Sequence, residues 1–179
     1  QDQIGGVVGG VKYIESAPGL RPAPVIDQLD PHLFQNRESA ECLTLFYTGI
    51  TRLARNILQE VVAQVNGKTP AYLFTLDYLR VLSLQARTAV ARRDLSALAR
   101  VISASWNANK RIHPSTTNDE VERLLDATRP HVAGVKLLGA GGGGYALFIS
   151  PSPDHAHRLR TLLVDQFENE RARIVTPSL

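Results

Sequence analysis

The sequence predicts an α+β fold built on an antiparallel sheet, and two observations lead to that prediction. Residues 135–176 show the order strand, glycine-rich loop, strand, helix and strand. A cluster of segments with helical periodicity precedes them, instead of a helix alternating with every strand. Helices segregated from antiparallel strands in this way are typical of the α+β class.

Six segments are predicted to be strands. Residues 11–16 alternate in polarity and lead into the turn-forming run Ala17-Pro18-Gly19, and residues 42–48 are rich in β-branched and aromatic side chains. A short helix, ended by Gly9-Gly10, is predicted ahead of them for residues 1–8. The predicted strands are residues 11–16, 24–29, 42–48, 135–138, 145–149 and, at the edge of its sheet, 171–176.

Five longer segments carry apolar residues at the helical spacing of three and four. Thr117-Asn118-Asp119-Glu120 forms an N-terminal helix signature, and Ser152-Pro153 starts the last helix. We expect Trp106 to belong to the core and Lys136 to lie at a solvated strand end. The five predicted helices are residues 53–66, 76–90, 95–106, 117–128 and 153–167.

The composition excludes several classes of protein. With 44% hydrophobic and 21% charged residues the chain is an ordinary globular one. Its formal net charge of +3 is too small to indicate nucleic-acid binding, although it suits a protein that handles small anions. No apolar run approaches the ~18 residues of a membrane span, and no signal-peptide pattern occurs, so we expect no membrane association and a cytoplasmic location.

Two further features concern single residues. Cys42, the one cysteine, lies in an apolar run, so we expect a buried small residue and not a nucleophile. The chain has no methionine and opens on the polar run Gln1-Asp2-Gln3, so we expect it to be a piece of a longer protein.

The glycine run at residues 139–144 satisfies the pattern G-x-G-x-x-G. A dinucleotide site would need a helix directly after the glycines, whereas a predicted strand follows here. Gly67-Lys68-Thr69 does not make a P-loop either, because the position five residues before Gly67 is Val62. Two interpretations of the glycine run remain: a tight hairpin turn, or a backbone that closely approaches a phosphate group. Five glycines in six positions favour the second.

Three motifs together resemble the GHMP-type small-molecule kinases, and within them the L-fucokinase branch. Asp2 alone would be interpreted as a helix cap. Together with the other motifs it indicates a different role. The motifs are Gln1-Asp2-Gln3-Ile4-Gly5-Gly6 with Gly9-Gly10-Val11-Lys12-Tyr13, then Phe46-Tyr47-Thr48-Gly49-Ile50-Thr51-Arg52-Leu53-Ala54, then Lys136-Leu137-Leu138-Gly139-Ala140-Gly141-Gly142-Gly143-Gly144-Tyr145.

The resemblance implies a division into two parts and a set of site residues. Residues 1–48 would be the trailing part of the kinase N-terminal domain, and residues 49–179 the ferredoxin-like C-terminal domain with added helices. Asp2 would be the catalytic base. Nucleotide or phosphate would lie next to Gly139, Ala140, Gly141, Gly142, Gly143 and Gly144, and substrate contacts would come from Gln1, Gln3, Thr48, Gly49 and Arg52.

The resemblance also implies the reaction. We expect an ATP- and Mg²⁺-dependent kinase that phosphorylates the anomeric hydroxyl of L-fucose or a similar sugar. The family's phosphate loop precedes the catalytic aspartate and is not in this chain, so the Mg²⁺ ligands are expected there and the isolated piece is expected to be inactive. The alternatives are a heptose-phosphate kinase and a non-catalytic binding or dimerisation module. We predict a homodimer formed through exposed strand edges.

Overall fold

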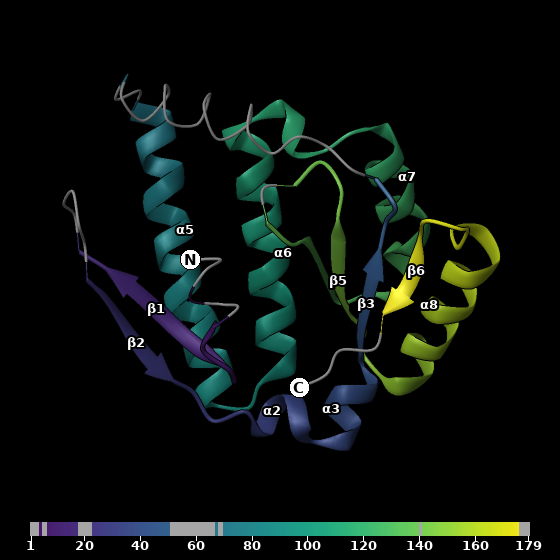
Figure 1. Ribbon diagram of the computed structural model, residues 1–179, viewed down its shortest axis with the longest axis horizontal. Coiled ribbons are helices and arrows are strands. Elements are labelled where there is room, and N and C mark those ends of the chain that lie inside the picture. Colours follow the sequence, from purple (N-terminus) through teal and green to yellow (C-terminus); the bar gives the residue numbers. More distant parts are fainter. Residues whose placement is uncertain are drawn as a thin grey trace.

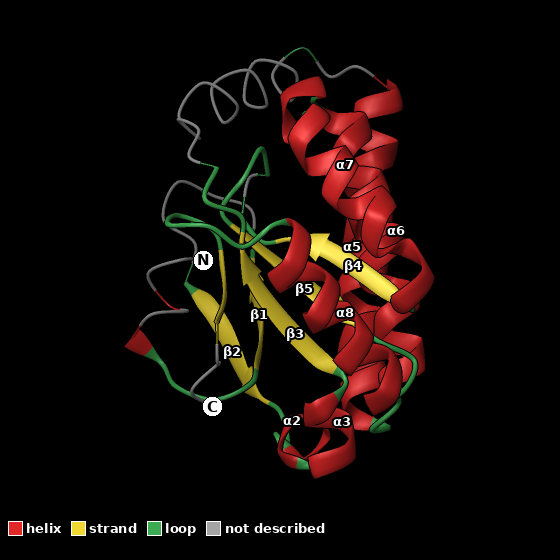
Figure 2. Cartoon of the chain, turned by 90° about the vertical axis from the view of Figure 1, so that its right-hand side faces the viewer, coloured by secondary structure: helices red, strands yellow, loops and turns green. Residues whose placement is uncertain are grey.

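The computed structural model describes residue 4, residues 7–17, 23–50, residue 67, and residues 70–139 and 141–175. Two sheets and four long helices account for most of this part of the chain (Figures 1 and 2). β1 (Lys12–Ser16) and β2 (Pro24–Gln28) form an antiparallel pair in which Lys12 lies opposite Gln28. Two short helices, α2 (His32–Gln35) and α3 (Arg37–Glu41), connect this pair to the second sheet.

The second sheet has four strands in the order β4-β5-β3-β6, and all neighbours are antiparallel. The chain visits β3 first, then β4 and β5, and β6 last, so the first strand lies between the third and the fourth. This is the strand order of a ferredoxin-like fold, with helices inserted between the first two strands. The strands are β3 (Leu43–Tyr47), β4 (Gly134–Leu137), β5 (Tyr145–Ile149) and β6 (Arg173–Val175).

Three of the long helices, α6, α7 and α8, begin at polar caps that satisfy backbone N–H groups otherwise left without partners. The side chains of Asp94, Asn118 and Ser152 accept hydrogen bonds from the N–H groups three residues later. The helices are α5 (Pro70–Ala91), α6 (Leu95–Ile112), α7 (Asp119–Thr128) and α8 (Pro153–Gln166), with 3₁₀ turns η1 (Pro114–Thr116) and η2 (Arg129–His131) on either side of α7.

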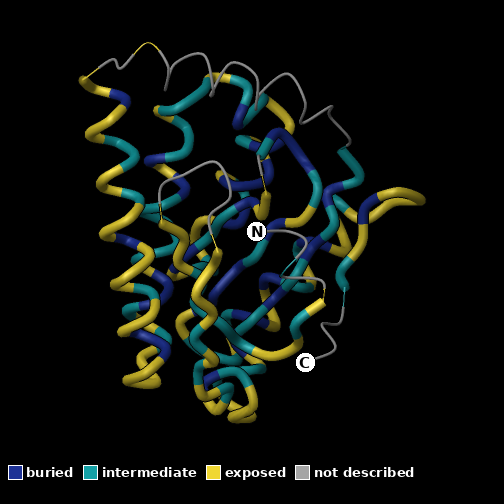
Figure 3. The backbone as a smooth tube through the Cα atoms, turned by 60° about the vertical axis from the view of Figure 1, so that its left-hand side comes forward, coloured by how far each residue is buried: buried dark blue, intermediate teal, exposed yellow. Residues whose placement is uncertain are grey.

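The main core lies between one face of the four-stranded sheet and helices α7 and α8, where Figure 3 shows the chain buried. Strand periodicity of two sends Phe46, Ala146 and Phe148 to this face. Trp106 of α6 closes it with 3% of its surface exposed, as predicted. A second cluster, formed by Leu33, Ala89, Val90, Leu98, Ala99 and Ile149, joins α2 and the α5–α6 pair to the other face.

Helix α6 covers the outer edge of β4, which the strand order leaves without a strand partner. The N–H of Val135 points to this edge and donates to Ser103 Oγ at 3.0 Å. Gly134 lets the two backbones meet, because a Cβ built there would lie 2.2 Å from the carbonyl oxygen of Ala99. An open strand edge invites pairing with another chain, and α6 removes that opportunity at β4.

The structure confirms the α+β class, the antiparallel sheet and all six predicted strands to within a few residues. It confirms the four predicted helices from residue 76 onward and the burial of Cys42. Burial raises the pKa of the Cys42 thiol, which disfavours the thiolate. The prediction missed α2 and α3, two helices of four and five residues that are too short for a periodicity to register. The helix predicted over residues 53–66, and most of the one over residues 1–8, lie outside the described residues.

The division between residues 48 and 49 stays a prediction. β3, which it assigns to the first part, pairs with β5 and β6 from the second part. A division ahead of α2 would keep the four-stranded sheet whole.

Gly134→Ala is expected to lower the free energy of unfolding by about 1–3 kcal/mol, because the added methyl group forces α6 away from β4. Gly9→Ala is the matched control, since a Cβ at residue 9 meets nothing within 4 Å. Urea unfolding of both variants measures the difference. Equal stability of the two would show that the α6–β4 contact is not tight in solution.

Candidate functional site

The glycine loop, residues 139–144, connects β4 to β5 and adopts a backbone that side chains rarely permit. Gly141 and Gly143 have φ angles of +88° and +154°, and Gly139, Gly142 and Gly144 also have positive φ. Glycine reaches this region at little cost because it has no Cβ. The conformation explains why the run tolerates little else, but it does not by itself show what the loop contacts.

Hydrogen bonds tie the glycine loop to two distant segments. The N–H of Gly142 donates to the carbonyl oxygen of Thr116 at 2.6 Å, and that of Gly144 to Ile50 at 3.0 Å. Thr48 donates in return to the carbonyl oxygen of Gly144, from its N–H at 2.8 Å and from Oγ1 at 3.0 Å. The loop is thereby held between the end of β3 and the turn η1.

The same two segments explain the density of glycine. A Cβ at residue 141 would lie 2.4 Å from the carbonyl oxygen of Thr116, and one at residue 143 would lie 2.3 Å from that of Ile50. The close approach that the sequence indicated is therefore, at these two positions, an approach to the chain's own backbone. Contact between the loop and a phosphate group stays a prediction, and the N–H groups of Gly142 and Gly144 are already engaged within the chain.

The structure brings together predicted site residues from separate parts of the sequence. Thr48 and Gly49 lie beside the glycine loop, and the positive φ of Gly49, +70°, places its backbone against Arg171 and Ala172. Five predicted residues lie outside the described part of the chain: Gln1, Asp2, Gln3, Arg52 and Ala140.

The segment from Thr116 to Asn118 is a neighbour of the loop that sequence reasoning missed. The side-chain amide of Asn118 donates to the carbonyl oxygen of Gly142 at 2.9 Å, while its Oδ1 caps α7. The sequence showed only the capping role, because nothing in it places residue 118 beside residue 142. The hydrogen bond from Asn118 to Gly142 depends on the folded chain and leaves no pattern in the sequence.

A polar network holds the segment from Thr116 to Asn118 against α6 and α7. Thr117 Oγ1 donates to Glu122 at 2.6 Å, and Lys110 forms an ion pair with the same carboxylate at 3.2 Å. The ammonium group of Lys110 also lies 5.9 Å from the centre of the Trp106 ring. The start of α7 is thus fixed to α6, and the loop contacts at Thr116 and Asn118 are fixed with it.

Lys136 differs from its prediction as a solvated strand end. It lies within β4, opposite Leu147, and its Nζ donates to Ser105 Oγ of α6 at 2.7 Å. Loss of water around the half-buried ammonium group lowers the pKa of Lys136. No ion pair joins Lys136 to a carboxylate among the described residues. The strand alternation puts Tyr145, whose ring centre is 5.0 Å from that of Tyr47, on the same face.

The described part of the chain offers neither a metal-binding cluster nor a membrane-spanning helix. The residues that the structure describes contain no group of three or more His, Cys, Asp or Glu side chains arranged to hold a metal ion. None of the helices described combines the length and apolar character needed to cross a membrane.

Known proteins that resemble this chain in sequence and in fold include GHMP kinases and a mevalonate kinase. Residues 86–169 match the family described as GHMP kinases C terminal. Residues 86–169 are therefore similar to the C-terminal domain of GHMP kinases. The fold agrees: the mevalonate kinase of L. major, solved in complex with R-mevalonate, superposes with a TM-score of 0.74 at 22% identity, over 95% of this chain and 50% of that one.

Two relatives carry names that bear on the function. A Bacteroides fragilis protein named L-fucokinase/L-fucose-1-P guanylyltransferase is 35% identical over 179 residues, which is all of this chain and 19% of that protein. The D-glycero-alpha-D-manno-heptose 7-phosphate kinase of Campylobacter jejuni is 25% identical over 167 residues, 93% of this chain and 48% of that enzyme. The chain therefore spans about a fifth of the first relative and about half of the second. The resemblance to the L-fucokinase branch is confirmed.

Gly141→Ala is expected to destabilise the protein by about 1–3 kcal/mol more than Gly139→Ala. Both glycines have positive φ, so both variants carry the same kind of backbone strain, but only residue 141 faces a carbonyl oxygen at 2.4 Å. Chemical denaturation of the pair isolates the contact. Equal losses would mean that φ alone accounts for the glycine.

Lys136→Met is expected to raise the melting temperature at pH 7 by up to about 4 °C, or roughly 1 kcal/mol. The native state holds the charged lysine at a cost, since its pKa is lowered there. The wild type recovers this stability as the pH rises toward 10.5, the ordinary lysine value, so the advantage of the variant shrinks in that range. Arg123→Met, which removes an exposed cation from α7, is the control for charge alone. A gain that persists unchanged at pH 10 would exclude desolvation as its cause.

Proposed function

We propose that the protein to which this chain belongs is an ATP-dependent sugar kinase that phosphorylates the anomeric hydroxyl of L-fucose or a similar sugar. The observation that carries the proposal is the match to the fucokinase relative, which is 35% identical over all 179 residues of this chain. The similarity of residues 86–169 to the C-terminal domain of GHMP kinases supports the phosphotransferase class independently of the sugar.

Asp2 is proposed as the base of this reaction. A carboxylate within hydrogen-bond reach of the attacking hydroxyl orients it and accepts its proton, which contributes about 10²–10⁴ in rate. Phosphoryl transfer otherwise depends on positioning and charge neutralisation more than on covalent chemistry. Bound ATP supplies the γ-phosphoryl group and the charge that Mg²⁺ would balance. The described residues offer no cluster for Mg²⁺, so we assign it no ligand in this part of the chain.

The glycine loop is proposed to form one wall of the substrate cleft. Its supports are rigid: β3 holds it through Thr48, and α7 holds it through Asn118. A wall of bare backbone leaves no side chain between the loop and a bound phosphate or sugar, so a ligand can approach it closely. Gln1, Gln3, Gly49 and Arg52 are proposed to complete the substrate contacts.

A heptose-phosphate kinase is the second candidate within the same family. The Campylobacter jejuni enzyme supports it, since this chain covers 48% of that enzyme against 19% of the fucokinase relative. Its lower identity, 25% against 35%, places it behind the fucokinase proposal.

The test is ADP release by the complete protein with Mg-ATP and, in turn, L-fucose, D-arabinose, galactose and a heptose phosphate. We expect turnover of L-fucose, and a fall in kcat of about 10²–10⁴ for Asp2→Asn with little change in ATP affinity. Asp165→Asn, on the exposed side of α8, is the matched control and should leave kcat unchanged.

Each other result has a definite meaning. Turnover of the heptose phosphate alone would replace the first candidate by the second. Full activity of Asp2→Asn would remove Asp2 from the mechanism. Without turnover of any of the four sugars, the sugar-kinase proposal would give way to a non-catalytic binding module.

A further inference from the structure

Helix α5 exposes a row of large apolar side chains that lies apart from its contacts with the rest of the fold. Phe74, Tyr78 and Val81 follow each other at spacings of four and three, the periodicity of a helix–helix seam. Their exposures are 72%, 39% and 42%, and Leu84 beside them is 37% exposed. Other sides of α5 make contacts within the fold: Arg87 pairs with Asp27 of β2 and lies over the Tyr13 ring of β1, and Ala89 and Val90 belong to the second core cluster.

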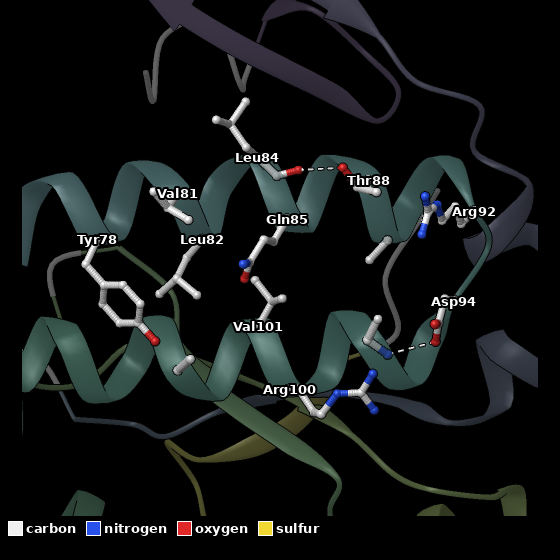
Figure 4. A pocket seen from close by; sticks show the side chains of 13 residues that line it. Tyr78, Val81, Leu82, Leu84, Gln85, Thr88, Arg92, Asp94, Arg100 and Val101 are labelled. Atoms are coloured by element: carbon white, nitrogen blue, oxygen red, sulfur yellow. Dashed lines mark hydrogen bonds between the residues drawn. The ribbon is translucent and has the colours of Figure 1, made fainter.

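The row borders a groove between α5 and α6, shown in Figure 4. The groove has a volume of about 500 Å³, and a neighbouring hollow of about 300 Å³ extends it toward Phe74. Across from the large side chains, α6 contributes small ones at helical spacing: Ala97, Val101, Ala104 and Ala108. Large residues on one helix and small ones on its neighbour form the knobs and the holes of helix packing on a single surface.

Each end of this surface carries one acidic and one basic side chain. At the end where α5 begins, Asp77 lies on α5 and Arg111 borders the hollow on α6. At the end where α5 finishes, Arg92 and Asp94 line the groove. Along α5 and the residue that follows it, Asp77 precedes Arg92, and from the N-cap of α6 to its end, Asp94 precedes Arg111. A two-fold operation that reverses both helices therefore places acid against base twice.

We propose that the α5–α6 hairpin binds the same hairpin of a second copy of this chain, antiparallel, about a two-fold axis that passes near Leu84, midway along the chain between Asp77 and Arg92. α5 then lies over α5 of the partner copy, and α6 over α6. Tyr78 of one copy meets the small-residue end of the other groove, at Ala97. Asp77 faces Arg92 of the other copy, and Arg111 faces Asp94. Two antiparallel hairpins joined in this way make a four-helix bundle.

The size of this surface fits a reversible dimer. α5 has 22 residues and α6 has 18, so they are about 33 Å and 27 Å long, and packed helices lie about 10 Å apart. The hairpin face is then about 600 Å² in each copy, or about 1,200 Å² in total, the lower limit of specific interfaces. We expect dissociation on dilution into the low micromolar range.

The proposal differs from association through strand edges and does not depend on kinase activity. α6 already covers the outer edge of β4. The buried sides of the hairpin, not its exposed row, hold it to the fold, so the row can be altered without removing the core contacts of Leu82, Val90 or Leu98.

The test is sedimentation velocity of the complete protein between about 1 µM and about 200 µM, the range in which an interface of this size should dissociate. We expect a monomer–dimer equilibrium whose dissociation constant rises at least about tenfold in Val81→Glu. Val164→Glu is the matched control: it makes the same change at a valine that is 47% exposed on α8, and it should leave the equilibrium unchanged.

A charge exchange tests the antiparallel orientation. Asp77→Arg and Arg92→Asp should each weaken the dimer by about three- to tenfold, and the double variant should recover most of the loss, since the pair is restored across the axis. Additive losses in the double variant would overturn this orientation.

Two further results would overturn the proposal as a whole. A protein that stays monomeric at every concentration, with a melting temperature lowered by Val81→Glu, would show that another part of the same molecule covers the row. A dimer that is insensitive to Val81→Glu would show that a different surface joins the copies.

Discussion

The approach of two backbone segments to the glycine loop is the constraint on which the site depends. The carbonyl oxygens of Thr116 and Ile50 come so near that a single methyl group at residue 141 or 143 would collide with them. Both segments also accept hydrogen bonds from the loop, so attraction and steric limit act at the same points. The loop therefore has one position relative to β3 and η1, set by these backbone contacts together with side-chain hydrogen bonds from Thr48 and Asn118.

This constraint links parts of the chain that are far apart in sequence. Thr48 directly follows β3, one of the two inner strands of the sheet, and its two hydrogen bonds to Gly144 span 96 residues. Asn118 begins α7 and reaches the same loop at Gly142. A ligand that touched the loop would therefore meet a surface anchored to the core by a strand and a helix. Such preorganisation is what a phosphotransferase needs, because its chemistry is mostly positioning and electrostatics.

The sequence predicted those features that one segment determines by itself. Period-two and period-three-to-four patterns located the strands and the described helices, and the polar caps at Asn118 and Ser152 located two helix starts. It could not predict what depends on contact between segments. Lys136 appeared to be a solvated strand end because nothing local indicates that α6 would cover it and present Ser105 to its ammonium group. The roles of Asp2 and Arg52 depend on residues outside the described part, and they remain predictions.

Helix α5 carries apolar residues on two of its sides, and only one of these sides is buried in the fold. Leu82 and Val90, both within the helix predicted over residues 76–90, are buried, and Val90 belongs to the second core cluster. A second apolar row begins at Phe74 on another side of the same helix, where the monomer gives it no cover. A helix that is apolar on two sides is stable in water only if both sides are packed, since exposed patches of this kind favour association. α6 presents small residues to this surface, and each end of the hairpin carries one acidic and one basic side chain. A second copy of the chain therefore fits both the shape and the polarity of the surface.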